Sequence, residues 1–274
     1  MSDQDVPAAR GNVFPYQDRI SVVTTEAPFR WLVAGWRDYT RAGMVSVGYG
    51  VLFAVAGLVL TVGLYFAGLE YLIAPLAAGF LLVGPSLTVG LYAISRDLAE
   101  GRTPALGSAL SAWRANPIPL LAFGLGQVLF LIIWMRLAVV IFAVSFPHQN
   151  VDLQSIVDTA LFTAEGNVFL LIGTVVGAVL ATIAFAVGAF SLPLMLDRRV
   201  GIIEAVVTSV VATFLNFRVM ALWAALIVLF TVAGLATAYV GLAITLPLVG
   251  HASWHAYRTV IRPNRGQRRC RRPR

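Results

Sequence analysis

The chain has 274 residues, of which 59% are hydrophobic and only 12% are charged, and its formal net charge is +7. A soluble domain carries about 25% charged residues, so this chain has too few to cover an ordinary water-facing surface. The composition excludes a typical soluble domain and predicts an all-α, polytopic membrane protein, because about 20 apolar residues suffice for one helix to cross a bilayer.

The chain opens with a polar segment, residues 1–28, which we expect to be a flexible cytoplasmic arm without a cleavable signal peptide. The next segment has apolar residues at i, i+3, i+4 and i+7, with Arg on the opposite side. The apolar residues of this stripe are Phe29, Leu32, Val33 and Trp36. The pattern predicts a helix that lies in the headgroup region of the bilayer.

Six apolar segments follow, and we expect each of them to cross the bilayer. They are residues 44–68, 72–95, 118–146, 167–196, 219–235 and 238–257. The last two form one continuous apolar run, which we divide near Gly234–Tyr239. With the preceding amphipathic helix, the six spans make up a membrane domain over residues 29–261.

Arginine residues alternate along these segments. They precede span one, lie between spans two and three and between spans four and five, and follow span six, whereas the other three connections contain none. Under the positive-inside rule this alternation predicts a bacterial inner-membrane protein with both termini in the cytoplasm. The Arg-rich tail, residues 262–274, is predicted to be disordered and attracted to anionic lipid headgroups. It lacks the aromatic residues of a nucleic-acid site, so we expect no nucleic-acid partner.

The sequence also repeats itself. A second amphipathic stripe (Leu106, Leu110, Trp113) precedes span three, and a third (Ile203, Val206, Val207, Val210, Phe214) precedes span five. The even-numbered spans contain similar proline motifs, F-L-L-V-G-P at residues 80–85, F-S-L-P at 190–193 and I-T-L-P at 244–247. We therefore expect three units, each made of one interfacial helix and two spans.

Several motifs carry a family resemblance. They are W-L-V-A-G-W-R-D-Y from Trp31, the F-L-L-V-G-P motif, W-M-R-L from Trp134, F-S-L-P-L-M-L-D-R from Phe190 and the closing L-P-L-V-G-H-A-S-W-H-A-Y from Leu246. With these motifs the chain resembles a bacterial family of predicted six-pass integral membrane proteins of unknown function. The resemblance spans residues 29–261 and implies no activity. The repeat is also similar, more loosely, to the membrane domain of some glycerophosphodiester phosphodiesterases, whose catalytic barrel is absent here.

Arg136 and Gln127 are the candidate ligand-binding residues. Both lie in span three, and an Arg near the centre of a membrane helix costs about 2.5–3.5 kcal/mol, so we expect Arg136 to face the bundle or a wet cavity. It would then bind an anion or headgroup, or form an internal ion pair, with Glu70 and Glu165 as possible partners. Gln127 is expected to be a polar bridge between helices.

His251 and His255 are the candidate metal ligands. Their i, i+4 spacing puts them on one face of span six, as in two-histidine metal sites. No third ligand is obvious in the sequence. The alternative is an interfacial girdle with Trp254 and Tyr257, because such rings collect at membrane surfaces.

No enzyme or cofactor motif is recognisable, and we expect neither an enzyme nor a bound cofactor. Asp97 and Asp197 follow spans two and four at matching places, each beside an Arg, and local ion pairs explain them better than paired catalytic carboxylates. The first interpretation is a scaffold, assembly factor or protein that binds lipid or membrane-protein partners. The alternatives are a small transporter or channel in which Arg136 lines a polar route, and a metal- or haem-binding protein.

Overall fold

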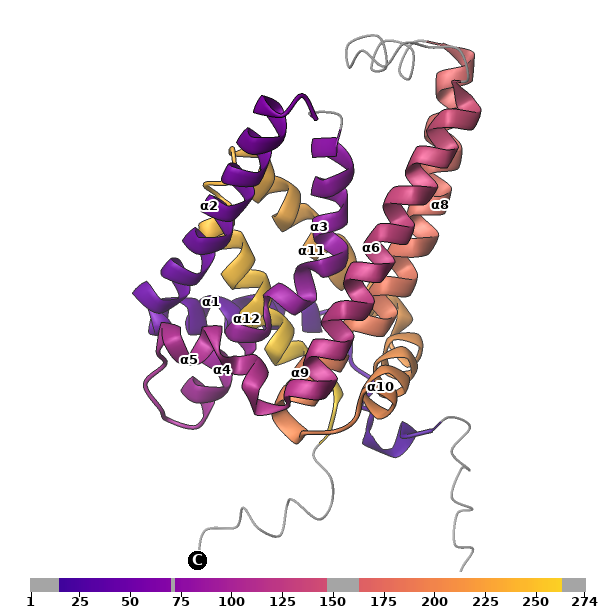
Figure 1. The fold of residues 1–274 in the computed structure, drawn as a ribbon. Coiled ribbons are helices and arrows are strands. Elements are labelled where there is room, and N and C mark those ends of the chain that lie inside the picture. Colours follow the sequence, from indigo (N-terminus) through magenta and orange to yellow (C-terminus); the bar gives the residue numbers. More distant parts are fainter. Residues whose placement is uncertain (1–14, 70–71, 147–162, 263–274) are drawn as a thin grey trace, which may run out of the picture.

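The computed structural model describes residues 15–69, 72–146 and 163–262, which form helices joined by short connections (Figure 1). In chain order they are η1 (Gln17–Arg19), α1 (Ala27–Ala42), α2 (Met44–Phe66), α3 (Ile73–Leu87), α4 (Val89–Ala99), α5 (Leu106–Leu110), η3 (Ala112–Ala115), α6 (Pro117–Ser145), α8 (Ala164–Gly188), α9 (Ser191–Arg198), α10 (Ile202–Leu215), α11 (Phe217–Ala236) and α12 (Leu242–Val260). Among these residues there is no strand, only one isolated antiparallel bridge between Ile20 and Ile261. The all-helical prediction is confirmed.

Within the described ranges, four helical segments are long and apolar enough to cross a bilayer. They are Met44–Phe66, Pro117–Ser145, Gly166–Arg198 and Phe217–Ala236, which match predicted spans one, three, four and five. Predicted span two corresponds to α3 followed by α4, and predicted span six corresponds to α12. The division of the long apolar run is confirmed, because α11 ends at Ala236 and α12 begins at Leu242.

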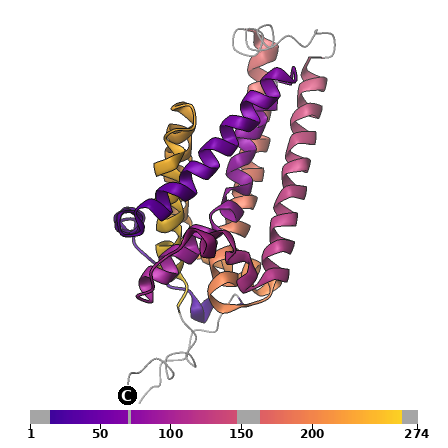
Figure 2. The same ribbon diagram turned by 60° about the vertical axis from the view of Figure 1, so that its left-hand side comes forward.

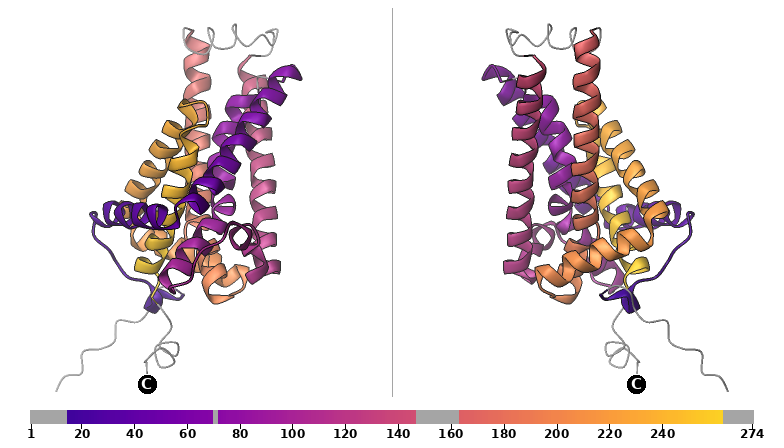
Figure 3. Two further views of the ribbon diagram at one scale, coloured as in Figure 1. Left: turned by 90° about the vertical axis from the view of Figure 1, so that its left-hand side faces the viewer. Right: turned by 90° about the vertical axis from the view of Figure 1, so that its right-hand side faces the viewer.

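The long helices stand on a base of short ones (Figures 1 and 2). Helices α4, α5, α9 and α10 gather at the lower end in Figure 1, and Figure 3 shows α1 lying across the long helices. The largest cluster of buried side chains, which includes Phe190, Met195 and Trp254, is built by these base helices and the end of α12. Side chains farther up the long helices, such as Leu129 and Val175, are exposed, as expected of a surface that faces hydrocarbon.

Helices also form at the three predicted amphipathic segments, as α1, as α5 with η3, and as α10. In α1 three residues of the predicted apolar stripe, Phe29, Val33 and Trp36, are exposed, whereas Leu32 is partly buried and packs against the core. The buried face of α1 is a different one, which includes Trp31 and Gly35. The outward stripe is what a helix at a lipid surface requires.

Span four breaks into α8 and α9 because of Pro193. Proline has no backbone N–H, and in a continuous helix its ring would clash with the carbonyl of Ala189. The backbone N–H of Phe190 donates instead to Ser209 Oγ of α10 over 3.0 Å, and this hydroxyl donates to the carbonyl of Ala186 over 2.8 Å. The break in span four therefore anchors α10 to the bundle.

Candidate functional site

Helix α1 crosses α12 at very short range. A Cβ atom at Gly35 would lie 2.7 Å from the backbone nitrogen of Ala252 and 2.9 Å from the carbonyl oxygen of Leu248. Both neighbours are backbone atoms that cannot turn aside, so only glycine permits this crossing. The close approach brings Asp38, one turn farther along α1, against the face of α12 that carries both histidines.

Asp38 is the centre of a buried polar network that joins α1, α4 and α12. Its side chain accepts a hydrogen bond from Ser95 Oγ over 2.7 Å and another from His255 Nε2 over 2.8 Å, both at Oδ2. The residue is only 7% exposed. A buried carboxylate is costly unless it is well bonded, and two donors on one oxygen provide that bonding.

His251 extends the network to α2. Its Nδ1 lies 2.8 Å from Ser95 Oγ, and its Nε2 lies 2.8 Å from Ser46 Oγ. Because the hydroxyl hydrogen of Ser95 is given to Asp38, Ser95 can only accept from His251, and the proton of a neutral imidazole must sit on Nδ1. Ser46 then donates to Nε2. The bonding assigns one tautomer to His251 and one direction to the chain of hydrogen bonds.

The network also sets the pKa of Asp38. Burial opposes ionisation of this carboxyl, but the hydrogen bonds from His255 and Ser95, together with the two histidine rings nearby, bring its pKa below the ordinary value of 3.8. Asp38 is therefore a carboxylate at neutral pH, as the direction of the hydrogen bonds requires.

The chain of hydrogen bonds runs from the surface to the interior. His255 is the accessible end, with 30% of its side chain exposed, whereas Ser46 and His251 are fully buried. Such a chain holds four helices together and gives both ring nitrogens of His251 a partner. Within the described residues, no three His, Cys, Asp or Glu side chains are placed to hold a metal ion.

The structure brings both predicted histidines into one hydrogen-bonded site. The girdle interpretation was wrong, because His251, Trp254 and Tyr257 are 0–1% exposed and cannot line the outer surface. Sequence reasoning missed Asp38, which follows Trp31 by seven residues on the buried face of α1. The signal was available, since Asp38 is the only acidic residue of α1. The two serines carry no such signal, because serine is common in membrane helices.

A second polar cluster lies where α9 meets the end of α12. Arg198 donates from Nε to Tyr257 Oη over 3.0 Å and from Nη2 to the carbonyl of Ile261 over 3.0 Å, and Tyr257 Oη donates to Asp197 Oδ2 over 2.6 Å. On α4, Asp97 forms an ion pair with Arg102. Both acids thus make the local polar contacts that the sequence predicted.

Part of the predicted flexible arm is ordered against this cluster. The N–H of Ser21 donates to the carbonyl of Val260, and the N–H of Arg262 donates to the carbonyl of Arg19, each over 2.8 Å. Arg19 also forms an ion pair with Glu204 of α10. The prediction of a flexible arm is therefore wrong for residues 15–27, which pack on α10 and α12. Residues 1–14 and the tail beyond Arg262 lie outside the described residues.

Arg136 lies on the outer face of α6, with its side chain exposed. It makes no hydrogen bond or ion pair with any described residue, so the expectation that it faces the bundle was wrong. The two carboxylates that the sequence offered as partners, Glu70 and Glu165, have no described side chains. The charge is tolerable on this face because a long side chain can extend along the helix toward the headgroups.

Gln127 is the predicted bridge between helices. It is 9% exposed, its Nε2 donates to the carbonyl of Leu82 over 2.9 Å, and its Oε1 accepts from Ser86 Oγ. Both partners are in α3, so the amide of Gln127 ties α6 to α3. The prediction of an interhelical bridge is confirmed.

Comparison with known proteins finds a family similarity over part of the chain. No match was found among curated proteins, and none among solved structures. The matched segment, residues 72–197, runs from α3 to α9 and includes Ser95 and Gln127, but neither Asp38 nor the two histidines. Over this segment the chain is similar to the family described as predicted integral membrane protein (DUF2189), and this match, together with the long apolar helices, identifies the chain as an integral membrane protein.

Proposed function

We propose that the chain is a non-enzymatic scaffold of a bacterial inner membrane, which crosses the bilayer six times and acts through contacts with lipid and partner proteins. The observation that carries the proposal is the closed polar network around Asp38. Its residues come from four helices, and their polar groups form hydrogen bonds with one another between these helices. Ser46, Ser95 and His251 are at most 1% exposed. Polar side chains that bind a substrate would instead converge on an open cavity.

The arrangement of helices supports six spans in three units. In this proposal α3 with α4, and also α12, cross the bilayer in addition to the four longer segments. Each pair of spans then follows one of the amphipathic segments that form α1, α5 and α10. The antiparallel bridge between Ile20 and Ile261 also supports a common side for both ends of the described chain.

The contact between Ser46 and His251 is the arrangement most like an active site, because a hydroxyl beside an imidazole can be activated as a nucleophile. A substrate would have to reach Ser46, whose exposed fraction is 0%. We therefore expect that a fluorophosphonate probe does not label this serine in the detergent-solubilised protein. Labelling that disappears in Ser46→Ala, but persists in the exposed-serine variant Ser108→Ala, would contradict the non-enzymatic role.

The scaffold role is tested at the outward stripe of α1. With a photoreactive amino acid in place of Trp36, we expect a discrete protein adduct in the native membrane, because the network around Asp38 holds this stripe in one orientation. The adduct should disappear when Asp38→Ala loosens α1, at unchanged expression. The control position is Val62 of α2, which is exposed and apolar and lies 16 residues after Ser46, the residue of α2 in the network. If the photoreactive residue at position 36 formed adducts with lipid only, the result would contradict the scaffold role.

The transporter alternative receives less support. It requires Arg136 to line a polar route, but this side chain is on the outside of α6, and the pocket beside α6 is lined by apolar side chains and one amide. No observation favours the haem or metal alternative over the hydrogen-bonded histidines.

A further inference from the structure

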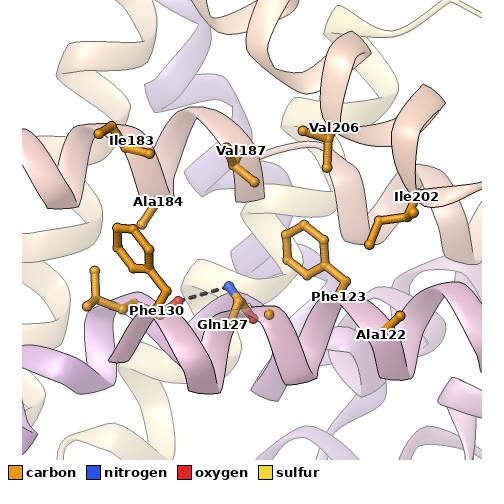
Figure 4. A pocket seen from close by; sticks show the side chains of 11 residues that line it. Ala122, Phe123, Gln127, Phe130, Ile183, Ala184, Val187, Ile202 and Val206 are labelled. Carbon is orange, nitrogen blue, oxygen red and sulfur yellow. Dashed lines mark hydrogen bonds between the residues drawn. The ribbon is translucent and has the colours of Figure 1, made fainter. Parts of the chain in front are cut away.

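A pocket of about 240 Å³ lies between α6, α8 and α10, with one residue of α3 in its wall (Figure 4). Its walls are apolar and include Phe123 and Phe130 of α6, Val187 of α8 and Val206 of α10. The pocket reaches the outer surface at Ile183, which is 48% exposed. Since α6 and α8 are both candidate membrane spans, this opening faces the bilayer, and the molecules that can enter are those dissolved in hydrocarbon.

Gln127 is the one polar residue in the wall, and Figure 4 shows its amide between the two phenylalanines. A side-chain amide has two N–H donors and one acceptor oxygen. The oxygen accepts from Ser86, and one N–H donates to Leu82, which leaves the second N–H without an acceptor among the described residues. An unpaired donor in an apolar pocket favours a ligand with an acceptor oxygen.

The depth of the amide restricts the charge of that ligand. Gln127 comes ten residues after Pro117, the first residue of α6, which is about 15 Å along the helix. A carboxylate or phosphate would be costly at that depth, whereas a neutral carbonyl is not. We propose that the pocket binds a neutral carbonyl compound of the membrane, with its hydrocarbon body against Phe123 and Phe130 and its carbonyl oxygen accepting from Gln127 Nε2. The proposal depends neither on the scaffold role nor on the number of spans.

Two membrane sources offer this chemistry, an acyl ester and an isoprenoid quinone. Their probes are methyl oleate and a decyl-substituted benzoquinone, with a long-chain alkene that lacks the carbonyl as reference. Binding to the full chain in detergent micelles is measured by native mass spectrometry. We expect one carbonyl probe to bind more tightly than the alkene, and the probe that binds identifies the source.

Two variants test separately the contributions of the Gln127 amide and of the pocket space to binding. Gln127→Leu should lower the affinity for the carbonyl probe about threefold to tenfold, which is the effect of losing one hydrogen bond. The affinity for the alkene should not change. Ala184→Phe fills the pocket from α8 while Gln127 is retained, and it should abolish binding of every probe. Ala181→Phe is the matched control, because Ala181 lies on the exposed side of the same helix.

Thermal unfolding of each variant confirms that the protein remains folded. Binding of neither carbonyl probe to the wild type would overturn the proposal. Unchanged carbonyl binding in Gln127→Leu, or full binding in folded Ala184→Phe, would overturn it as well.

Discussion

Asp38 shows how strongly one buried carboxylate can organise its surroundings. It accepts from a serine of α4 and a histidine of α12, and through that serine it fixes the tautomer of His251. Removing the carboxylate would leave the buried Ser95 hydroxyl and the partly exposed His255 ring without an acceptor at once. The effect of a substitution here should therefore exceed that of an exposed ion pair of similar length.

Asp38→Ala should lower the free energy of unfolding by about 1–3 kcal/mol for each donor left unpaired. Thermal unfolding in detergent micelles measures the change. The control is Glu26→Ala, which breaks the exposed pair of Glu26 with Arg30 on the same helix and should cost about 0–1 kcal/mol. A double variant with Ser95→Ala should lose less than the sum of the two single losses, because the residues share one hydrogen bond. Additive losses would argue against a coupled network.

The lowered pKa of Asp38 predicts how stability changes in acid. A carboxyl whose pKa is depressed on folding contributes stability that is present above its unfolded-state pKa, about 3.9, and is lost as pH falls through the lower folded-state value. Below about pH 4 the wild type should therefore lose stability more steeply than Asp38→Asn, which has no proton to take up there. Thermal unfolding across the acid range tests this, and parallel curves for the two proteins would refute it.

At the scale of elements, the contact between α1 and α12 depends on the absence of one side chain. Gly35→Ala should be destabilising, because its methyl group would press on backbone atoms of α12. Gly63→Ala in α2 meets no atom within 4 Å and should be neutral or stabilising by up to about 1 kcal/mol, since alanine is the better helix former. The two variants make the same chemical change with opposite expected signs in thermal unfolding. Equal changes in stability for the two variants would mean that α1 and α12 can move apart enough to accept a methyl group at residue 35.

For the whole molecule, the proposal of six spans predicts on which side of the membrane each connection between helices lies. Cys270 is the only cysteine, so Cys270→Ser gives a cysteine-free background. In intact spheroplasts a membrane-impermeant maleimide should label Val240→Cys, between α11 and α12, but leave Arg102→Cys, after α4, unlabelled until the membrane is opened. If only the four longer segments crossed, the connection after α4 would remain outside. Labelling of Arg102→Cys in intact spheroplasts would therefore contradict six spans.

Much of this fold was predictable, because long apolar runs, proline motifs and charge alternation are local signals. They located the helices, the division between α11 and α12, and the outward stripe of α1. The site was predictable only in part. The spacing of His251 and His255 identified their shared face, but their partner Asp38 is separated from His255 by 217 positions in the sequence. No local pattern reports which helices meet. The prediction that the Arg136 side chain faces the bundle was wrong for a related reason. The energetic cost of a charge in the membrane does not show which face of α6 turns outward.

That separation along the chain also has a consequence for how the protein is made. A ribosome adds about 5–20 residues per second, so roughly 10–40 s pass between the synthesis of Asp38 and that of His255. During that interval α1 has no α12 to cross, and Asp38 lacks one of its two donors. The first helix to be synthesised is thus among the last to be completed, and a polypeptide released before α12 would expose an unpaired carboxylate by which the cell could recognise it as unfinished.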